Sequence, residues 1–211
     1  MIPTRTPFFL PWIYPQLRWR MNADTKDLYL TFDDGPVPGP TEFVLDTLAA
    51  FSCKATFFCI GDNIRKFPHV FGRIRETGHA IGNHTFNHLN GWKTKGSEYV
   101  QNIKMCDDEI SRNGSAPHKN KLFRPPYGRI TTRQVRALHD YRIVMWDVLT
   151  HDYHSALSPE KCLSTSLSAT RNGSIIVFHD SYKAEKNIRF VLPRFIERLL
   201  EQGYHFKALF Q

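Results

Sequence analysis

The sequence lacks any long apolar run. Its most hydrophobic N-terminal stretch, residues 7–15, is interrupted by Pro11 and is far shorter than the ~20 residues that a membrane-spanning helix needs. Arg18 and Arg20 follow it, and no small-residue cleavage site does, so a secretory signal is not indicated. We therefore expect no transmembrane segment and favour a cytoplasmic location over the cell envelope. We expect residues 1–27 to form an arm packed on the domain, with these side chains covering a hydrophobic surface: Phe8, Phe9, Trp12, Ile13 and Tyr14.

Cysteines are few, and none forms a C-x-x-C pair, which excludes a zinc knuckle or a dithiol redox motif of that spacing. A reduced compartment is favoured, although four cysteines leave a disulfide open. The formal net charge is +8, which favours anionic partners in general. The basic residues are scattered, however, and no nucleic-acid-binding motif concentrates them, so we expect no nucleic-acid partner.

The 211 residues suit one domain with a full core, and 41% hydrophobic with 23% charged residues is ordinary globular usage. Strand-like and helix-like patterns alternate from residue 28 to the C-terminus. The expected strands are 28–32, 55–60, 79–84, 122–124, 141–148, 174–178 and 205–209, and the expected helices are 43–51, 70–77, 98–112, 131–138, 159–170 and 185–202. This alternation predicts an α/β domain with a parallel sheet, either open or closed into a barrel.

Reactive side chains fall at or just after the ends of these strands. They are Asp33, Asp34, His84, Arg124, Asp152 and His179. In a barrel of parallel strands the carboxyl ends converge on one face, where such enzymes keep their chemistry. Residues about 150 positions apart in the chain can then meet in one pocket.

Two of the patterns indicate a metal site. His84 and His88 are spaced i and i+4, so on a helical turn both imidazoles would reach one ion. The adjacent carboxylates Asp33 and Asp34 repel each other unless a cation or donors lie nearby. One could serve as a ligand and the other as a base, although two ordinary histidines and an Asp-rich turn would give the same patterns.

Together these motifs resemble the polysaccharide deacetylases of the NodB-homology type, the family of chitin, peptidoglycan and acetylxylan deacetylases. The resemblance covers the chain from about residue 28 to its end. It rests on four motifs in family order: Thr31-Phe-Asp-Asp-Gly35, the His84 and His88 pair, Arg124-Pro-Pro-Tyr127 and Val177-Phe-His179-Asp180. It implies a catalytic domain over 28–211 with a distorted (β/α) barrel, often of seven strands.

The resemblance also implies a role for each matching residue. Asp34, His84 and His88 would hold a divalent metal, with zinc expected and cobalt or nickel also accepted by such ligands. Asp33 would be the general base and Arg124 would orient it. Two further roles are implied: the backbone N–H of Tyr127 would bind the oxyanion, and His179, held by Asp152, would be the general acid.

One motif departs from the family pattern. The family shows Asp-x-x-Asp-Trp where this chain has Leu149-Thr-His-Asp152-Tyr153, so Leu149 replaces an aspartate and Tyr153 replaces the tryptophan. By the resemblance, Tyr153 and Val177 would form the acetyl pocket. Asp147 is an alternative partner for His179, and His151 and His154 are expected to be loop residues, because the three-ligand set is complete without them.

The sequence thus predicts a metal-dependent hydrolase that releases acetate from N-acetylated sugars of chitooligosaccharide, peptidoglycan or a related glycan, and that acts as a monomer. An O-acetyl esterase acting on xylan-like glycans would use the same residues. A sugar- or metal-binding pseudoenzyme is a third alternative. Loss of Asp33 or His179 would have indicated that alternative, and both are present.

Overall fold

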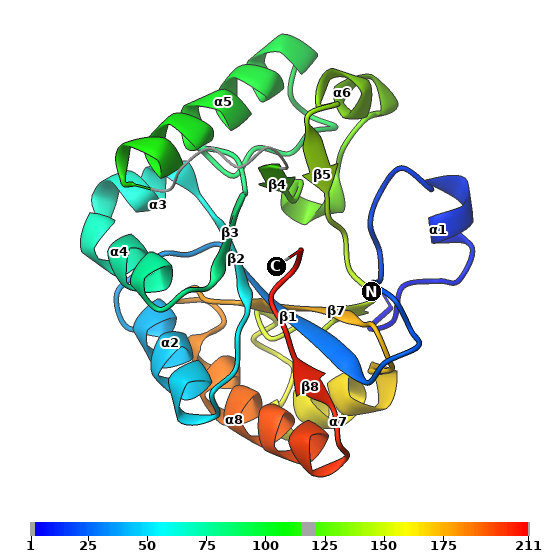
Figure 1. Cartoon of the computed structure of the whole chain (residues 1–211). Coiled ribbons are helices and arrows are strands. Elements are labelled where there is room, and N and C mark those ends of the chain that lie inside the picture. Colours follow the sequence, from blue (N-terminus) through cyan, green and yellow to red (C-terminus); the bar gives the residue numbers. More distant parts are fainter. Residues whose placement is uncertain (1–2, 115–120, 211) are drawn as a thin grey trace.

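The computed structural model of the chain describes residues 3–114 and 121–210. A curled parallel sheet forms its centre, and helices surround the sheet on the outside (Figure 1). The strands are β1 (Asp27–Asp33), β2 (Thr56–Cys59), β3 (Ala80–Asn83), β4 (Lys121–Phe123), β5 (Tyr141–Ile143), β6 (Val148–Leu149), β7 (Ile175–His179) and β8 (His205–Phe206). They confirm the predicted α/β class and the predicted strand positions to within a few residues.

Seven strands follow one path in the order β5-β4-β3-β2-β1-β7-β6, and β8 pairs with β1 beside it. Residues 141–148, predicted as one strand, form two. β5 pairs with β4, and β6 pairs with β7 at the other end of the path. The chain is redirected at Met145, whose N–H donates to the Arg18 carbonyl and whose carbonyl accepts from the Arg124 side chain. Because one stretch supplies both edges, the sheet curls into the expected barrel-like form.

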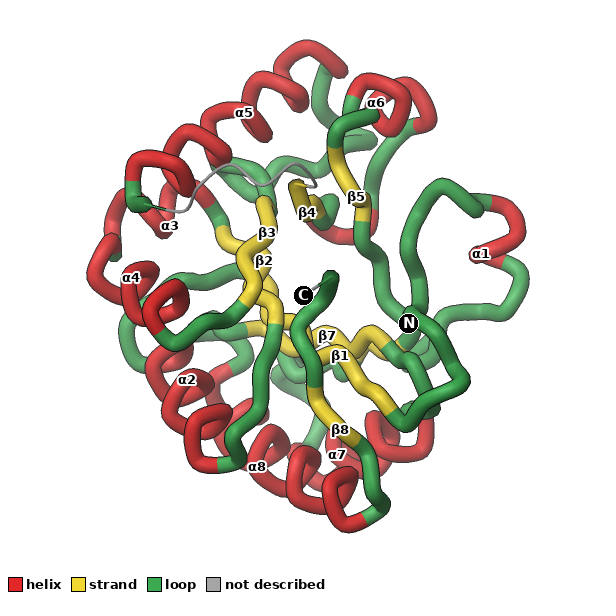
Figure 2. Tube along the Cα trace, in the orientation of Figure 1, coloured by secondary structure: helices red, strands yellow, loops and turns green. Residues whose placement is uncertain are grey.

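Helices form an outer layer around this sheet, seen as the red ring in Figure 2. They are α2 (Pro40–Ala50), α3 (Gly61–Lys66), α4 (Pro68–Glu76), α5 (Gly96–Arg112), α6 (Thr132–Ala137), α7 (Pro159–Ala169) and α8 (Glu185–Glu201), with a 3₁₀ turn η1 (Pro126–Gly128). The short helix α1 (Leu10–Ile13) projects to one side of this ring. Capping residues in the sequence determine where several of these helices begin. The Ser158 hydroxyl caps α7 ahead of Pro159, and Thr131 with Gln134 forms a capping box on α6. None of the described helices is long and apolar enough to cross a membrane.

Alternation along the central strands decides which side chains face the helices. On β1, Leu28, Leu30 and Phe32 join the large core between sheet and helices, as Ile176 and Phe178 do on β7. Successive side chains of a strand point to opposite faces. The intervening residues of both strands, which end with Asp33 and His179, therefore face the interior of the curled sheet.

The N-terminal arm is attached to the domain, but not through the side chains that were expected to cover it. Residues Arg5 and Arg18 form single bridges with Val148 and Val144, and the buried side chains of Leu17 and Trp19 fill the core near β4 and β5. The five side chains expected to cover a hydrophobic surface are instead exposed: Phe8, Phe9, Trp12, Ile13 and Tyr14. That part of the prediction was wrong, because the arm docks through its other apolar residues.

Candidate active site

The predicted site residues do converge at the carboxyl ends of the strands. Asp33 ends β1 and His179 ends β7, and the two are paired in the register of these neighbouring strands. His84 directly follows β3, and Arg124 directly follows β4. Parallel strands deliver their carboxyl ends to one edge, which explains how residues from four strands come together.

Asp34, His84 and His88 form a cluster of potential metal ligands, with one donor atom of each within 4.8 Å of the others. An Asp34 carboxylate oxygen lies 3.7 Å from Nε2 of His84 and 3.2 Å from Nε2 of His88. Zinc binds imidazole nitrogen and carboxylate oxygen at about 2.0 to 2.2 Å, so ligand atoms spaced in this way can share one ion. The donor set therefore fits a divalent metal of the zinc type.

The two histidines are not on a helical turn, which corrects the basis of their prediction. Residues 84–88 form a loop in which Thr85 and His88 have positive φ angles of 64° and 55°. The Asn102 side chain on α5 holds this loop by accepting from the N–H groups of Phe86 and Asn87. A contact distant in sequence, and not helical spacing, therefore brings the two imidazoles together, with ring centroids 5.1 Å apart.

Both imidazoles present Nε2 to the cluster because Nδ1 is engaged elsewhere. Nδ1 of His84 lies 2.8 Å from the Arg124 carbonyl oxygen, to which it donates, and Nδ1 of His88 lies 3.0 Å from the Tyr127 hydroxyl. Burial lowers the pKa of His84 to about 4, so its ring is neutral, as a ligand must be. Burial raises the pKa of Asp34, but the hydrogen bond from His88 and the nearby histidines outweigh burial and hold that pKa below its usual range.

Asp33 is held by a buried arginine, as predicted. Nη1 of Arg124 donates to Asp33 Oδ1 at 2.7 Å, and the guanidinium is 0% exposed. Its other N–H groups donate to the Thr31 hydroxyl and to the carbonyls of Val144 and Met145. Burial lowers the pKa of Arg124, and the Asp33 carboxylate opposes that shift. Within the described residues, no hydrogen bond engages Oδ2 of Asp33, so this oxygen can accept a proton.

Asp152 and His179 form the second predicted pair. Asp152 accepts from Nδ1 of His179 and from the His179 backbone N–H, each at 2.8 Å. Burial lowers the pKa of His179, but the Asp152 charge and hydrogen bond, together with Asp34 and Asp33, raise it to about 9 overall. His179 is therefore protonated near neutral pH, and its Nε2 carries a proton that it can donate.

The residues predicted to contact substrate lie around this centre. The exposed ring of Tyr127 packs edge-on against His88 at 4.6 Å, and its backbone is left-handed with φ 60°. The ring of Tyr153 packs edge-on against His179 at 4.8 Å. Val177 is buried two residues before His179 on the same side of β7, and it pairs with Leu149 of β6. The pocket role of these residues stays a prediction.

The alternatives raised by the sequence do not join the site. Asp147 accepts from the Arg171 guanidinium and the Ser174 hydroxyl, so it is not the partner of His179. His151 lies 3.4 Å from the Tyr153 hydroxyl through Nδ1, and in the described part of the chain neither it nor His154 belongs to a metal-ligand cluster. All four cysteines are free and buried: Cys53, Cys59, Cys106 and Cys162.

Three supporting residues were missed by the sequence reasoning. Thr31 donates to the Ile176 carbonyl and accepts from Arg124, and the Asn63 side chain donates to the Asp34 carbonyl. Asp180 accepts from the Gly35 N–H and the Thr41 hydroxyl, and burial raises its pKa to about 8. Thr31 and Asp180 stood inside motifs already noted: Thr31 lies on β1 two positions before Asp33, and Asp180 directly follows His179 at the end of β7. Asn63 lay in no motif that could have indicated its role from the sequence.

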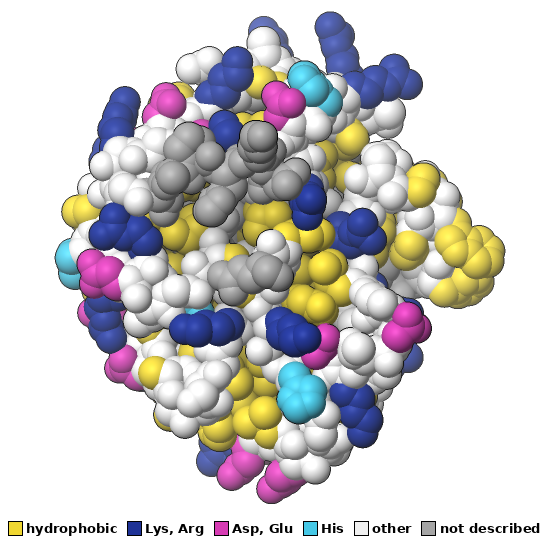
Figure 3. Space-filling model, viewed as in Figure 1, with side chains coloured by type: hydrophobic (Ala, Val, Ile, Leu, Met, Phe, Trp, Pro, Cys, Tyr) yellow, Lys and Arg dark blue, Asp and Glu magenta, His cyan; other side chains and the backbone are white. Residues whose placement is uncertain are grey.

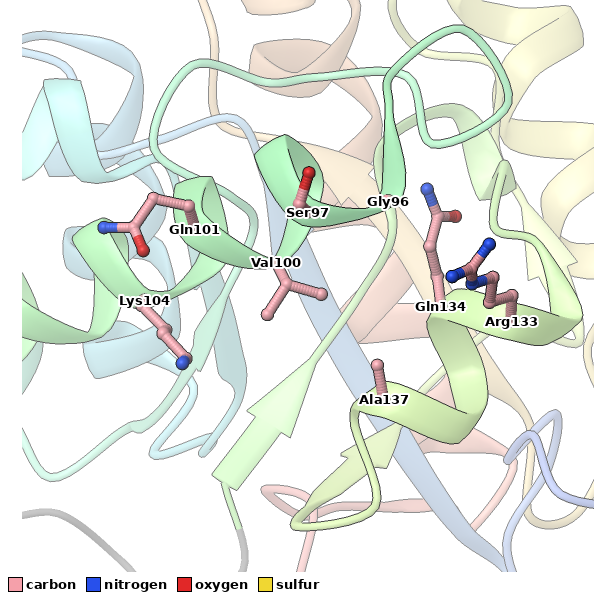
Figure 4. A pocket seen from close by; sticks show the side chains of 8 residues that line it. All are labelled: Gly96, Ser97, Val100, Gln101, Lys104, Arg133, Gln134 and Ala137. Atoms are coloured by element: carbon pink, nitrogen blue, oxygen red, sulfur yellow. The ribbon is translucent and has the colours of Figure 1, made fainter.

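A separate groove of about 560 Å³ lies between α5 and α6, where Ser97, Gln101 and Arg133 are among the lining residues (Figure 4). None of the predicted site residues lines it. The convergent cluster at the strand ends therefore remains the site with a chemical rationale.

Comparison with known proteins assigns the family. The family model for polysaccharide deacetylases matches residues 20–146, more than half of the chain. The chain belongs to the polysaccharide deacetylase family. Among its relatives, a peptidoglycan-N-acetylglucosamine deacetylase of Bacillus cereus is 38% identical over 158 residues, which are 74% of this chain and 56% of the relative. A chitooligosaccharide deacetylase of Azorhizobium caulinodans is 35% identical over 76% of this chain and 77% of its own.

A solved structure extends the likeness to nearly the whole of this chain. The crystal structure of the Bc1960 peptidoglycan N-acetylglucosamine deacetylase, in complex with 4-naphthalen-1-yl-N-oxidanyl-benzamide, has a TM-score of 0.88 and 33% sequence identity. The match covers 97% of this chain and 95% of that one. By contrast, the alignment with the 38% identical Bacillus cereus relative covers 56% of the length of that relative.

Proposed function

We propose that this protein is a metal-dependent hydrolase that removes N-acetyl groups from N-acetylated sugars of oligo- or polysaccharides and releases acetate. The observation that carries the proposal is the meeting of three groups at one edge of the sheet. They are the ligand cluster Asp34, His84 and His88, the Asp33–Arg124 pair and the Asp152–His179 pair. A bare ligand cluster would suit a binding protein. The paired base and acid beside it are what hydrolysis requires.

Asp34, His84 and His88 would hold the ion, for which zinc fits the donor set and cobalt or nickel are accepted by the same ligands. Such an ion, when bound, polarises a carbonyl and lowers the pKa of water. Two of these side chains are already in the protonation state that a ligand needs. Asp34 is ionised and His84 is neutral, so neither has to lose a proton before it can bind.

Asp33 would accept the proton of the attacking water. Arg124 donates to Oδ1, which leaves Oδ2 to take the proton. A new C–O bond then forms at the acetyl carbon, and the carbonyl oxygen becomes an oxyanion. The backbone N–H of Tyr127 would donate to that oxyanion. Tyr127 has a left-handed backbone, with φ 60°, inside η1.

His179 would complete the reaction as the acid. The C–N bond breaks only if the nitrogen gains a proton, because an amine anion is a very poor leaving group. Asp152 holds Nδ1 of His179, so Nε2 is the nitrogen that donates the proton. The raised pKa of about 9 keeps that proton in place near neutral pH. The products are acetate and a free amino sugar.

The test measures acetate release from N-acetylglucosamine oligomers and from peptidoglycan by metal-stripped protein, with and without added Zn²⁺ or Co²⁺. We expect metal-restored release that Asp33→Asn and His84→Ala both abolish. Release from acetylated xylan but from no N-acetylated glycan would instead assign an O-acetyl esterase. No release from any of these substrates, with metal demonstrably bound, would reject the proposal that the protein is an enzyme of this kind.

A further inference from the structure

The N-terminal arm carries an exposed group of aromatic side chains that the site does not use. We call residues 7–16 the aromatic loop. Within it Trp12 is 77% and Phe8 is 74% exposed, and Phe9, Ile13 and Tyr14 are exposed as well. Side chains of this size are normally withdrawn from water, and a contiguous exposed group of them marks an interaction site. In Figure 3 the corresponding hydrophobic surface projects from the right edge of the molecule, where Figure 1 shows α1.

The loop displays these rings from a fixed base. On one side, the N–H of Thr6 donates to the Asp147 carbonyl at 2.8 Å. On the other side, the N–H of Arg18 donates to the Ile143 carbonyl at 2.9 Å. The Phe8 ring packs edge-on against Phe9 and Trp12, with centroids 5.8 and 6.0 Å apart. Phe8 thus contacts two rings of its own loop, and most of the Phe8 and Trp12 side chains is left exposed to solvent.

The sequence on both sides of the loop is positively charged. Arg5 and Arg18 are exposed at its two ends, Arg20 is half-buried, and no acidic residue occurs before Asp24. The whole chain carries a net charge of +8. Exposed aromatic rings with an arginine at each end of the loop complement the interface of a bilayer that contains anionic lipids. Trp and Tyr are the residues enriched at that depth.

Other occupants fit the loop less well. A stable protein interface takes about 20 to 30 residues from each side, more than this ten-residue loop offers. A sugar-binding platform needs polar groups that fix the hydroxyls, and for that purpose the side chains of the aromatic loop offer only the Trp12 indole N–H, the Tyr14 hydroxyl and the Gln16 amide. We propose that the aromatic loop docks this domain on an anionic membrane surface, with Phe8 and Trp12 entering the interfacial layer.

The proposal does not rest on the hydrolase assignment, and it is tested with the full chain and sucrose-loaded vesicles in a sedimentation assay. The vesicles are pure phosphatidylcholine or contain about one third phosphatidylglycerol, because anionic headgroups supply the electrostatic attraction. We expect at least about tenfold stronger partition onto the anionic vesicles, weakened by high salt. The double variant Phe8→Ser/Trp12→Ser should lose about tenfold, and Arg18→Gln about fivefold.

Trp92→Ser is the matched control, because Trp92 is an exposed tryptophan outside the loop and its loss should leave partition unchanged. Thermal unfolding of each variant checks that it is folded. Equal partition of the double variant and the parent would overturn the proposal, as would no partition of the parent. A self-association in sedimentation equilibrium that the double variant abolishes, without vesicle binding, would assign the loop to a second copy. Binding to insoluble chitin, lost in the same variant, would assign it to glycan.

Discussion

Asp152 accepts two hydrogen bonds from His179, one from the ring Nδ1 and one from the backbone N–H. Each of these nitrogens lies 2.8 Å from a different carboxylate oxygen. The arrangement fixes both the charge and the direction of the ring. Burial alone would lower the pKa of His179, and the Asp152 charge is the first of the opposing causes that raise it to about 9 from an ordinary 6.5. The pair therefore keeps an imidazolium at the end of β7.

We expect Asp152→Asn to return the pKa of His179 to its ordinary value or lower, because burial then acts with less opposition. In the parent, turnover should fall as the pH rises through about 9. In the variant this fall in turnover should occur below pH 7, and turnover at pH 7.5 should drop by about 100-fold or more. Rate profiles and an NMR titration of His179 measure both effects. Asp147→Asn, which removes a buried carboxylate bound to Arg171, should leave the titration of His179 unchanged.

The same pKa makes a stability prediction. His179 binds its proton more tightly in the folded than in the unfolded state, since its pKa is raised from 6.5 to about 9. Its contribution to the free energy of unfolding is thus fully present below pH 6.5 and is lost as the pH rises through 9. In Asp152→Asn that loss between pH 6.5 and 9 should be absent in urea titrations. A parallel pH dependence in parent and variant would contradict the assignment of the shift to Asp152.

We expect the effects of substitutions at Asp33 and Arg124 on the free energy of unfolding to be strongly coupled. Arg124→Met leaves the Asp33 carboxylate almost fully buried without its cation, which should cost about 3 to 5 kcal/mol in the free energy of unfolding. In an Asp33→Asn background the same change leaves no unpaired charge, so it should cost about 1 to 2 kcal/mol less. Denaturant unfolding of the four proteins measures the difference. Equal costs in the two backgrounds would mean that Arg124 stabilises the fold only through its bonds to carbonyls and Thr31.

Metal binding to the ligand cluster should appear as stabilisation of the folded protein. Zn²⁺ at 100 times its dissociation constant should add about 2.7 kcal/mol to the free energy of unfolding, since the site exists only in the folded state. His88→Ala should remove most of this gain at the same concentration. His154→Ala is the control, because His154 is an exposed histidine outside the cluster. An equal gain in the parent and in His88→Ala would place the ion elsewhere.

The sequence predicted the strands and the residues at their ends because both follow from local patterns. The run Leu28 to Phe32 and the run Ile175 to Phe178 are apolar enough to be buried on both faces, and a parallel sheet brings their ends together. The reactive residues come immediately after these runs. Their convergence could therefore be inferred without knowing any side-chain contact.

The loops could not be inferred, because contacts distant in sequence shape them. The left-handed backbone at Thr85 and His88 depends on the side chain of Asn102, which lies on a different element. The break near Met145 depends on hydrogen bonds with Arg18 and Arg124. Neither contact leaves a periodic pattern. The outward direction of the aromatic loop was missed for a similar reason, since apolar composition alone does not say whether a side chain is buried.

The Tyr127 hydroxyl gives a prediction that separates two roles of one residue. It lies 3.0 Å from Nδ1 of His88, so it orients the ring whose Nε2 faces Asp34. Tyr127→Phe removes this bond but keeps the backbone N–H, and we expect metal affinity to fall about 10- to 100-fold, as for other partners of metal-binding histidines. At saturating metal, kcat should stay close to that of the parent. Chelator competition measures the affinity, with the exposed Tyr182→Phe as the control. Unchanged affinity in Tyr127→Phe would leave Tyr127 with a backbone role alone, and a fall in kcat at saturating metal would mean that the hydroxyl acts on the substrate.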